Sequence, residues 1–256
     1  MTAPPFDALV LCATPRSGST LLCSLLASSG VAGRSESWYR AQNRDEFAAA
    51  WSLPRDANGR WSPADYLRAT LAAGRSPNGM FGLRLMHDTL SPLLAELRML
   101  HPQAAGDADL LACAFGRPAF VHLSRADRVA QAVSRLKAEQ TGLWHLADDW
   151  EERLPGGPAR YDRDRIATFA AEAEADDAAW AAWFAASDLR PAAMLYEDLA
   201  RDPVAVASAL IAELGLRDAA PITFGNRRLA DADSEEWVAR FRAEGGLTPP
   251  APSDPC

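Results

Sequence analysis

Residues 14–20 read Thr-Pro-Arg-Ser-Gly-Ser-Thr and join two apolar segments whose patterns predict how the fold begins. Before it, residues 8–13 form a short apolar run that is typical of a buried strand. After it, residues 21–29 place apolar side chains on one helical face, and Gly30 is a suitable helix stop. The sequence therefore predicts a strand, a tight turn and a helix at the start of the chain.

The residue types in this turn suit the binding of an anion. Free N–H groups at a helix N-terminus point outward, and the helix dipole places partial positive charge there. Gly18 allows the backbone to approach phosphate oxygens closely. Ser17, Ser19 and Thr20 add hydroxyl donors, and Arg16 adds a charged donor. We therefore predict a phosphate-binding loop; the plainer alternative is a strand-to-helix turn capped by serine.

The loop lacks a feature of nucleotide-hydrolysing enzymes. A Walker A loop has Lys directly before its Ser or Thr, whereas here Gly18 precedes Ser19 and Thr20 without a Lys. This difference disfavours a P-loop kinase or nucleotide hydrolase, which stays as an alternative. A second alternative is a nucleotide-binding protein without catalytic activity.

Length and charge limit the class of protein. At 256 residues the chain is long enough for one α/β domain with a large core. We expect residues 1–256 to form a single domain, with a mobile tail at 246–256. The net charge of −8 argues against nucleic acid or an anionic membrane as the main partner. An anion site must therefore be a local basic pocket.

The cysteines and the apolar runs bear on the compartment. None of the four cysteines forms a close pair or a metal-binding spacing, and Cys12 and Cys23 fall in the predicted first strand and helix, where they would be buried. We expect a reduced, cytoplasmic environment. The N-terminus does not resemble a signal peptide, and no apolar run approaches the roughly 18 residues of a transmembrane span.

Strand and helix patterns alternate along the rest of the chain. This order predicts an α/β fold with a mostly parallel central sheet covered by helices on both faces. The further strands are expected at residues 80–86, 119–124 and 191–196, and the further helices at 65–73, 91–100, 128–145, 162–186, 203–214 and from 234 onward.

A second group of polar residues follows the third predicted strand. In an open parallel sheet the ligand lies at the carboxyl ends of the strands, so Arg125, directly after that strand, is expected to meet the ligand of loop 14–20. Ser134 lies about two turns into the following helix. The alternatives are an ion pair between Arg125 and Asp127 and an ordinary surface serine.

Together these residues resemble the sulfotransferase superfamily. Its phosphosulfate loop has a basic residue before Ser-Gly-Thr/Ser-Thr, and Arg16 stands where many members have Lys. Its members bind the 3′-phosphate of 3′-phosphoadenosine 5′-phosphosulfate with an Arg after a strand and a Ser in the next helix, a pair that Arg125 and Ser134 resemble. Further segments resemble the bacterial carbohydrate sulfotransferases typified by trehalose 2-sulfotransferase: residues 30–33, 74–79, 82–86, 131–134, 140 with 144, 180 with 183–184, and 228–231 leading to 236–237.

The resemblance implies a P-loop-like sulfotransferase fold and an enzyme that moves a sulfuryl group from that donor to a hydroxyl of a carbohydrate or glycolipid. The donor would be a co-substrate held by residues 16–20, Arg125, Ser134 and Arg228, the last by its likeness to the family's C-terminal segment. Catalysis would consist of positioning and charge stabilisation, with Arg16 near the leaving phosphate oxygen. No metal is implied, and a homodimer is expected.

The acceptor hydroxyl needs a general base. The family branch uses a Glu soon after the Val-Ala-Gly segment, and Glu36 is the carboxylate in that segment here. Aligning the aromatic residues that follow instead places Ser37 at the family's Glu position. His87, at a predicted strand end, and His122, which fits a core histidine better, are rivals to Glu36. Arg84 shares the strand end with His87 and either steadies the sulfuryl group or a sugar, or forms a surface ion pair.

Overall fold

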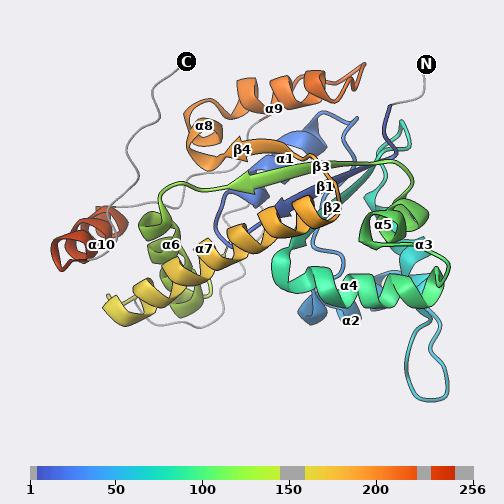
Figure 1. Ribbon diagram of the computed structural model, residues 1–256, viewed down its shortest axis with the longest axis horizontal. Coiled ribbons are helices and arrows are strands. Elements are labelled where there is room, and N and C mark those ends of the chain that lie inside the picture. The colour runs from blue at the N-terminus through green and yellow to red at the C-terminus, as the bar shows by residue number, and fades with distance from the viewer. Residues whose placement is uncertain (1–4, 145–158, 224–231, 246–256) are drawn as a thin grey trace.

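The computed structural model describes residues 5–144, 159–223 and 232–245. Over these ranges, four strands form one parallel sheet in the order β2-β1-β3-β4 (Figure 1). The strands are β1 (Ala8–Ala13), β2 (Phe81–Met86), β3 (Pro118–Ser124) and β4 (Ala192–Leu195). The α/β class and the parallel sheet predicted from the sequence are confirmed, and each predicted strand agrees with the structure to within one residue.

The strand β1 lies between β2 and β3 and is covered on both faces. All of its residues are buried, and it pairs with both neighbours along its whole length. A strand of this kind carries apolar residues at consecutive positions rather than at alternate ones, which is the pattern read from residues 8–13. Because the strands are parallel, the segments that follow β1, β2 and β3 all leave the sheet at its carboxyl edge.

Helices cover the two faces of the sheet separately (Figure 1). On one face, Leu9 and Leu11 of β1 share an apolar cluster with α1, α8 and α9. On the other face, Val10 shares a cluster with α4, α5 and α7. The helices are α1 (Ser19–Ser28), α2 (Arg44–Ala50), α3 (Pro63–Gly74), α4 (His87–Leu100), α5 (Asp107–Phe115), α6 (Arg128–Thr141), α7 (Arg163–Ala186), α8 (Tyr196–Arg201), α9 (Pro203–Glu213) and α10 (Ala232–Ala243), with a short 3₁₀ helix at Ala41–Asn43.

A third apolar cluster holds α6 beyond the carboxyl edge of the sheet. Val133 of α6 packs with Phe169 of α7 and with Trp237 and Phe241 of α10. Figure 1 shows α6 and α10 together on the side to which β3 points. The cluster therefore fixes the helix that carries Ser134 next to the ends of the strands.

One helix starts a full turn earlier than the sequence predicts, and another is not predicted. α4 begins at His87, directly after β2, whereas the predicted helix begins at residue 91 with Pro92 in its first turn. Pro92 lies inside the helix, where it lacks an N–H to donate. Leu90 is buried on the same face as the later leucines of α4, so burial of the apolar face outweighs the lost hydrogen bond. α8, which the sequence does not predict, begins at Tyr196, a residue expected to end the fourth strand.

The remaining differences are at helix ends and in short helices. α6 ends at Thr141 because Gly142 adopts a left-handed conformation with φ of 73°, earlier than the predicted end at 145. The sequence does not predict α2 or the 3₁₀ helix before it. The expected tail at 246–256 lies outside the described residues.

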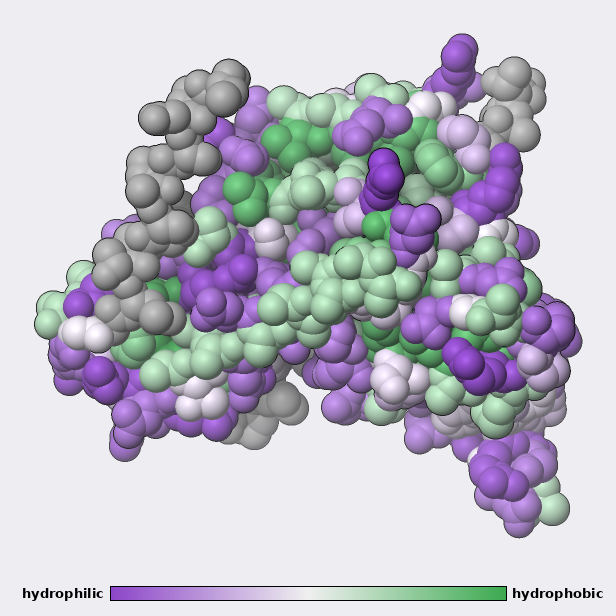
Figure 2. All heavy atoms as spheres, in the orientation of Figure 1, coloured by the Kyte–Doolittle hydropathy of each residue, from purple (hydrophilic) through white to green (hydrophobic). Residues whose placement is uncertain are grey.

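The distribution of side chains between surface and interior agrees with the sequence patterns. Cys12 and Cys23 are buried, as predicted. Hydrophilic side chains cover much of the face in Figure 2, and a pale green band follows α7, whose exposed positions are largely alanine. Among the helices of the described ranges, none is both long and apolar enough to cross a membrane.

Candidate active site

The loop between β1 and α1 contains an unfavourable backbone conformation. The N–H of Ser17 donates to the carbonyl of Thr14 at 3.2 Å, which closes a four-residue turn around Pro15 and Arg16. Arg16 has a φ of 65°, in the left-handed region that residues other than glycine rarely occupy. A turn with Pro first and a positive φ second is a type II turn, whose second central position normally holds Gly. Such strain is often found at functional sites.

Gly18 ends the loop at a position that only glycine fits. Its φ is 90°, and among the described residues no side chain caps the start of α1. A Cβ atom on Gly18 would lie 2.5 Å from Cδ2 of Tyr196 at the start of α8. The first N–H groups of a helix have no acceptor within the helix. The loop therefore presents backbone donors at a helix N-terminus, where an anion is favoured.

Arg16 reaches from this loop to α6. Its Nε donates to Oγ of Ser134 at 2.9 Å, and its guanidinium also donates to the carbonyl of Trp144. Arg125 approaches from the end of β3, and its Nη1 lies 3.3 Å from the carbonyl oxygen of Arg16. The loop, Arg125 and Ser134 thus lie together at the carboxyl edge of the sheet, as expected from the sequence.

The charge of Arg16 and the buried hydroxyl of Ser17 favour the binding of an anion at this loop. Burial, followed by repulsion from Arg125, lowers the pKa of the Arg16 guanidinium to about 10. Both acceptors described for Arg16 are neutral oxygens. The Oγ atom of Ser17 is buried and has no hydrogen-bond partner within the described chain. A phosphate or sulfate group would supply both a counter-charge and acceptor oxygens.

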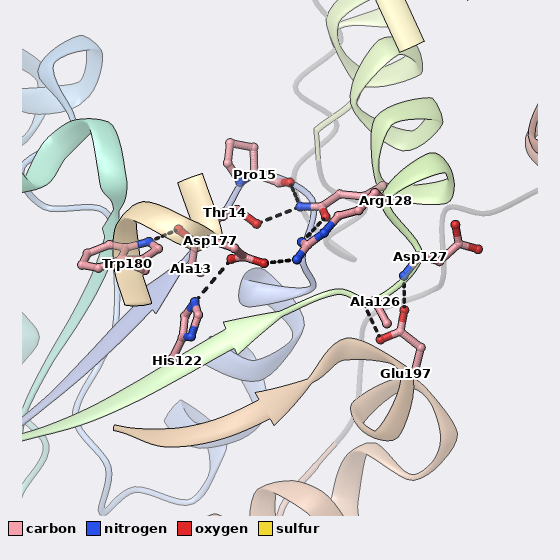
Figure 3. A network of polar contacts seen from close by, with 11 residues as sticks. Ala13, Thr14, Pro15, His122, Ala126, Asp127, Arg128, Asp177, Trp180 and Glu197 are labelled. Atoms are coloured by element: carbon pink, nitrogen blue, oxygen red, sulfur yellow. Dashed lines mark hydrogen bonds and ion pairs between the residues drawn. The ribbon is translucent and has the colours of Figure 1, made fainter. Parts of the chain in front are cut away.

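The start of α8 supports the loop that carries Arg125. The guanidinium of Arg125 lies 4.4 Å from the ring centroid of Tyr196, which is cation–π geometry. The carboxylate of Glu197 accepts the N–H groups of Ala126 and Asp127, both at 3.1 Å (Figure 3). These contacts hold the residues between β3 and α6 in place.

Asp127 has a structural role that differs from the ion pair with Arg125 considered above. Its Oδ1 accepts the N–H of Ala130 at 3.0 Å and so caps α6. The same oxygen lies 2.8 Å from Nη2 of Arg242 in α10. The described contacts therefore place Asp127 with α6 and α10, whereas Arg125 lies against Tyr196 and the phosphate-binding loop.

The segment that carries Glu36 crosses strand β2 at very short range. A Cβ on Gly33, whose φ is 74°, would lie 2.4 Å from the backbone nitrogen of Gly82. Glycine at both positions allows the two backbones to touch. Glu36 then forms an isolated parallel bridge with Leu83, and its carbonyl accepts the N–H of Arg84 at 3.0 Å. This crossing brings Glu36 to the carboxyl half of β2.

Arg84 joins the Glu36 segment to the phosphate-binding loop. Its Nε donates to Oγ of Ser37 and its Nη1 to Oγ1 of Thr20, both at 2.9 Å. Its Nη2 lies 3.6 Å from a carboxylate oxygen of Glu36. The Arg84 side chain is only 12% exposed, whereas that of Glu36 is 52% exposed. Arg84 therefore forms a largely buried contact rather than a simple surface ion pair, and it meets both residues considered for the family's Glu position.

His87 lies apart from these contacts. It is the first residue of α4, and its ring packs edge-on against Trp180 at 5.3 Å between centroids. With Leu94 and Trp183 it lines a cavity of about 630 Å³ formed by α4, α5 and α7. The contacts described for His87 do not link it to Glu36 or to loop 14–20.

His122, the other rival, belongs to a polar network. Its Nε2 lies 3.3 Å from Oδ1 of Asp177 in α7, and Asp177 also forms an ion pair with Arg128 (Figure 3). The side chain of His122 is 16% exposed, so it is a partly buried hydrogen-bonded histidine rather than an apolar core residue. Arg128 also donates to Gln131, which contacts the phosphate-binding loop.

Two residues that received no role in the site from the sequence alone support this loop. The amide of Gln131, which is 1% exposed, donates to Oγ1 of Thr14 at 2.8 Å and to the carbonyl of Pro15 at 2.7 Å. Its position three residues before Ser134 places it on the same side of α6, which is a usable signal. Tyr196 follows β4 directly and so lies at the ligand-binding edge of a parallel sheet.

The family resemblance also assigns Arg228 to the donor and implies no metal. Arg228 lies outside the described residues. Over the described ranges, no cluster of three or more His, Cys, Asp or Glu side chains is placed to hold a metal ion.

Comparison with known proteins identifies the family. The family model described as "Stf0 sulphotransferase" matches residues 8–244. The trehalose 2-sulfotransferase of Mycolicibacterium smegmatis is 31% identical over 267 residues, with 95% of this chain and 97% of the relative covered. The trehalose 2-sulfotransferase of Mycobacterium tuberculosis is 29% identical over 252 residues, with 91% and 93% covered. Among solved structures, the sulfotransferase domain of the Synechococcus PCC 7002 olefin synthase is similar at a TM-score of 0.45 and 16% identity, over 98% of this chain and 91% of that one. Because the family model spans both the phosphate-binding loop and the Arg125–Ser134 region, the chain belongs to the Stf0 sulphotransferase family.

Proposed function

We propose that the chain transfers the sulfuryl group of 3′-phosphoadenosine 5′-phosphosulfate to a hydroxyl of a carbohydrate or glycolipid. The acceptor oxygen attacks sulfur in line with the bond to the donor's 5′-phosphate oxygen. The new O–S bond forms as the old one breaks, the acceptor proton passes to a protein carboxylate, and adenosine 3′,5′-bisphosphate leaves. As in phosphoryl transfer, the protein contributes mainly positioning and charge stabilisation.

The observation that carries this proposal is the meeting of Arg16, Arg125 and Ser134 at the N-terminus of α1. The donor has phosphate groups at two positions of its ribose, and two cations from different elements suit such a ligand. Arg16 and the loop N–H groups stabilise the charge that develops on the 5′-phosphate oxygen. Arg125 and Ser134 bind the 3′-phosphate. The buried Oγ of Ser17 supplies a further donor. Arg228 is assigned to the same nucleotide by its likeness to the family's C-terminal segment alone.

Glu36 accepts the proton of the acceptor hydroxyl. Its carboxylate is half exposed, so a substrate can reach it, and it lies 3.6 Å from the cation of Arg84. Arg84 also holds Thr20 of the phosphate-binding loop, which keeps the base at a constant place relative to the donor site. His87 is the second candidate for the base. The contacts described for it are with Trp180 and not with the phosphate-binding loop, so Glu36 is the better candidate.

The acceptor is a carbohydrate by analogy with the relatives. Both named relatives are trehalose 2-sulfotransferases, so trehalose is the first acceptor to test. A mass-spectrometric screen of sugars and glycolipids with isotopically labelled donor would identify the acceptor. Labelled product should form with a sugar and should be absent when the acceptor is omitted.

Ligand-induced thermal shifts separate this function from a kinase or nucleotide hydrolase. Adenosine 3′,5′-bisphosphate at 100 times its Kd should stabilise the fold by about 2.7 kcal/mol, a shift of roughly 5–10 °C for a chain of this size. ATP with Mg²⁺ should give little or no shift. A shift with ATP and Mg²⁺ alone would contradict the proposal. Binding of the bisphosphate without any sulfuryl transfer would indicate a catalytically silent protein.

We also propose that the chain is one catalytic domain that forms a homodimer, on the basis of its likeness to the family. Size-exclusion chromatography with light scattering should then give about twice the 27.6 kDa of one chain. Limited proteolysis should leave one resistant core rather than two. A monomer at micromolar concentration would contradict the dimer.

A further inference from the structure

The type of the turn that carries Arg16 depends on the direction in which the carbonyl group of Pro15 points. Types I and II of the β-turn share their ends but differ by a flip of the central peptide, which here joins Pro15 to Arg16. Type II gives the second central residue a positive φ, and type I gives it a negative one. A residue with a Cβ atom prefers type I, yet Arg16 has a φ of 65°. Another contact must therefore hold this peptide in its less favoured orientation.

Gln131 makes that contact. Its side-chain Nε2 donates to the carbonyl of Pro15 at 2.7 Å, which is the oxygen that would move in a flip. The same nitrogen donates to Oγ1 of Thr14 at 2.8 Å. Gln131 is 1% exposed, so water cannot replace these hydrogen bonds if the peptide flips.

The Gln131 amide is itself oriented by charged groups. Arg128 donates from Nη1 to Oε1 of Gln131 at 3.2 Å, which leaves Nε2 to face the turn. Arg128 is held in turn by an ion pair with Asp177 of α7, and Asp177 contacts His122 of β3. Figure 3 shows this chain of contacts running from His122 through Asp177 to Arg128, with Thr14 and Pro15 at its end. Groups from α6, α7 and β3 therefore support one amide.

We propose that Gln131 is a positioning residue that locks the Pro15–Arg16 peptide in the type II orientation and thereby aims the Arg16 guanidinium into the phosphate site. This lock, the hydrogen bond from Gln131 to Pro15, fixes backbone geometry whatever the protein binds. Its effect on donor binding rests on the function proposed above. If the lock is lost, the turn relaxes to type I, and Arg16 leaves its 2.9 Å contact with Ser134.

A structural test uses Gln131→Met, which keeps the size of the side chain and removes its donor. Thr14→Val is the matched control, because it removes the other acceptor of Gln131 and keeps the hydrogen bond to Pro15. Crystal structures should show a negative φ at Arg16 in Gln131→Met and a positive φ in the wild type and in Thr14→Val. A positive φ at Arg16 in all three would overturn the proposal.

If Gln131→Met does not fold, Gln131→Glu gives the same comparison. The ionised glutamate keeps the acceptor for Arg128 but cannot donate to Pro15. The expected result is again a negative φ at Arg16, and retention of a positive φ would overturn the lock.

A binding test separates the lock from general packing. Gln131→Met should weaken adenosine 3′,5′-bisphosphate binding about ten- to a hundredfold in a chain with Arg16, the range for one hydrogen bond to a charged group. In combination with Arg16→Gly, it should change affinity less than about twofold, because glycine adopts a positive φ freely and no guanidinium remains to be misdirected. Equal losses in both backgrounds would overturn the proposal. If the wild type itself does not bind the bisphosphate, the proposed function fails, while the crystal structures still decide the lock.

Discussion

The Nε atom of Arg16 lies 2.9 Å from the Oγ atom of Ser134, although 118 positions separate the two residues in the sequence. The contact joins the loop after β1 to the helix after β3, the neighbouring strand in the sheet. It orients the cation before any ligand binds, and such preorganisation lowers the entropic cost of binding.

The first prediction concerns Arg16 itself. Arg16→Ala should lower kcat by about 10²–10³, the usual effect of removing a donor to a developing negative charge. Its thermal stability should not fall. The folded state lowers the pKa of Arg16 to about 10, so the unfolded chain holds this proton more strongly, and at neutral pH the charge disfavours folding. That penalty is relieved only as pH rises through about 10.

Steady-state kinetics and a thermal melt check this prediction. Arg68→Ala is the control, because its side chain is 76% exposed and the ion pair described for it is a local one with Asp65. It should retain full activity. A wild-type kcat in Arg16→Ala would remove Arg16 from the mechanism.

The second prediction separates Glu36 from Ser37. Glu36→Gln should lower kcat by about 10²–10⁴, the contribution typical of a general base, with little change in donor affinity. Ser37→Ala should lower kcat by less than about tenfold, because Ser37 contributes one hydrogen bond to Arg84. The measurement is single-turnover transfer at saturating donor. Activity retained in Glu36→Gln but lost in His87→Ala would move the base to His87.

The third prediction concerns Arg84. Arg84→Lys keeps the charge, but one ammonium group cannot reach Thr20, Ser37 and Glu36 in the fork geometry of the guanidinium. We expect kcat to fall about tenfold or more while the affinity for adenosine 3′,5′-bisphosphate changes little. Arg98→Lys, on the exposed side of α4, is the matched control. Equal kinetics for the two variants would show that the three-way contact is dispensable.

The fourth prediction compares two glycines with left-handed backbones. Gly30→Ala should cost about 1 kcal/mol of stability from backbone strain, because no other part of the described chain lies within 4 Å of the added Cβ. Gly18→Ala has the same strain and also brings its Cβ to 2.5 Å from the Tyr196 ring. It should cost roughly 1–3 kcal/mol more, as overpacking does.

Because Tyr196 also contacts Arg125, Gly18→Ala should weaken bisphosphate binding as well, whereas Gly30→Ala should not. Chemical denaturation and isothermal titration calorimetry measure the two effects. Equal stability and affinity in the two variants would mean that the Tyr196 ring moves away without consequence.

Local patterns explain why much of the fold could be predicted. The six consecutive buried residues of β1 and the loop after it, with its Arg, its single Gly and its hydroxyl residues, are signals within one short stretch. The positions of Arg125 and Ser134 also followed, because a parallel sheet brings the ends of its strands to one edge. The start of α4 could not be predicted in this way. Pro92 is a strong local signal for a helix start, but the burial of Leu90 in the core cluster beside the sheet outweighs it.

The parallel α/β fold and the meeting of Arg16, Arg125 and Ser134 at its carboxyl edge follow from the amino-acid sequence alone, because strand patterns and turn residues act between neighbours in the chain. The contacts that hold the site in place became visible only in the folded chain: Gln131 donates to the carbonyl of Pro15, Tyr196 packs against Gly18, and Arg84 joins Thr20 to Ser37. These contacts join residues from different elements. Their geometry depends on how the helices pack on the sheet, and no short stretch of sequence carries that information.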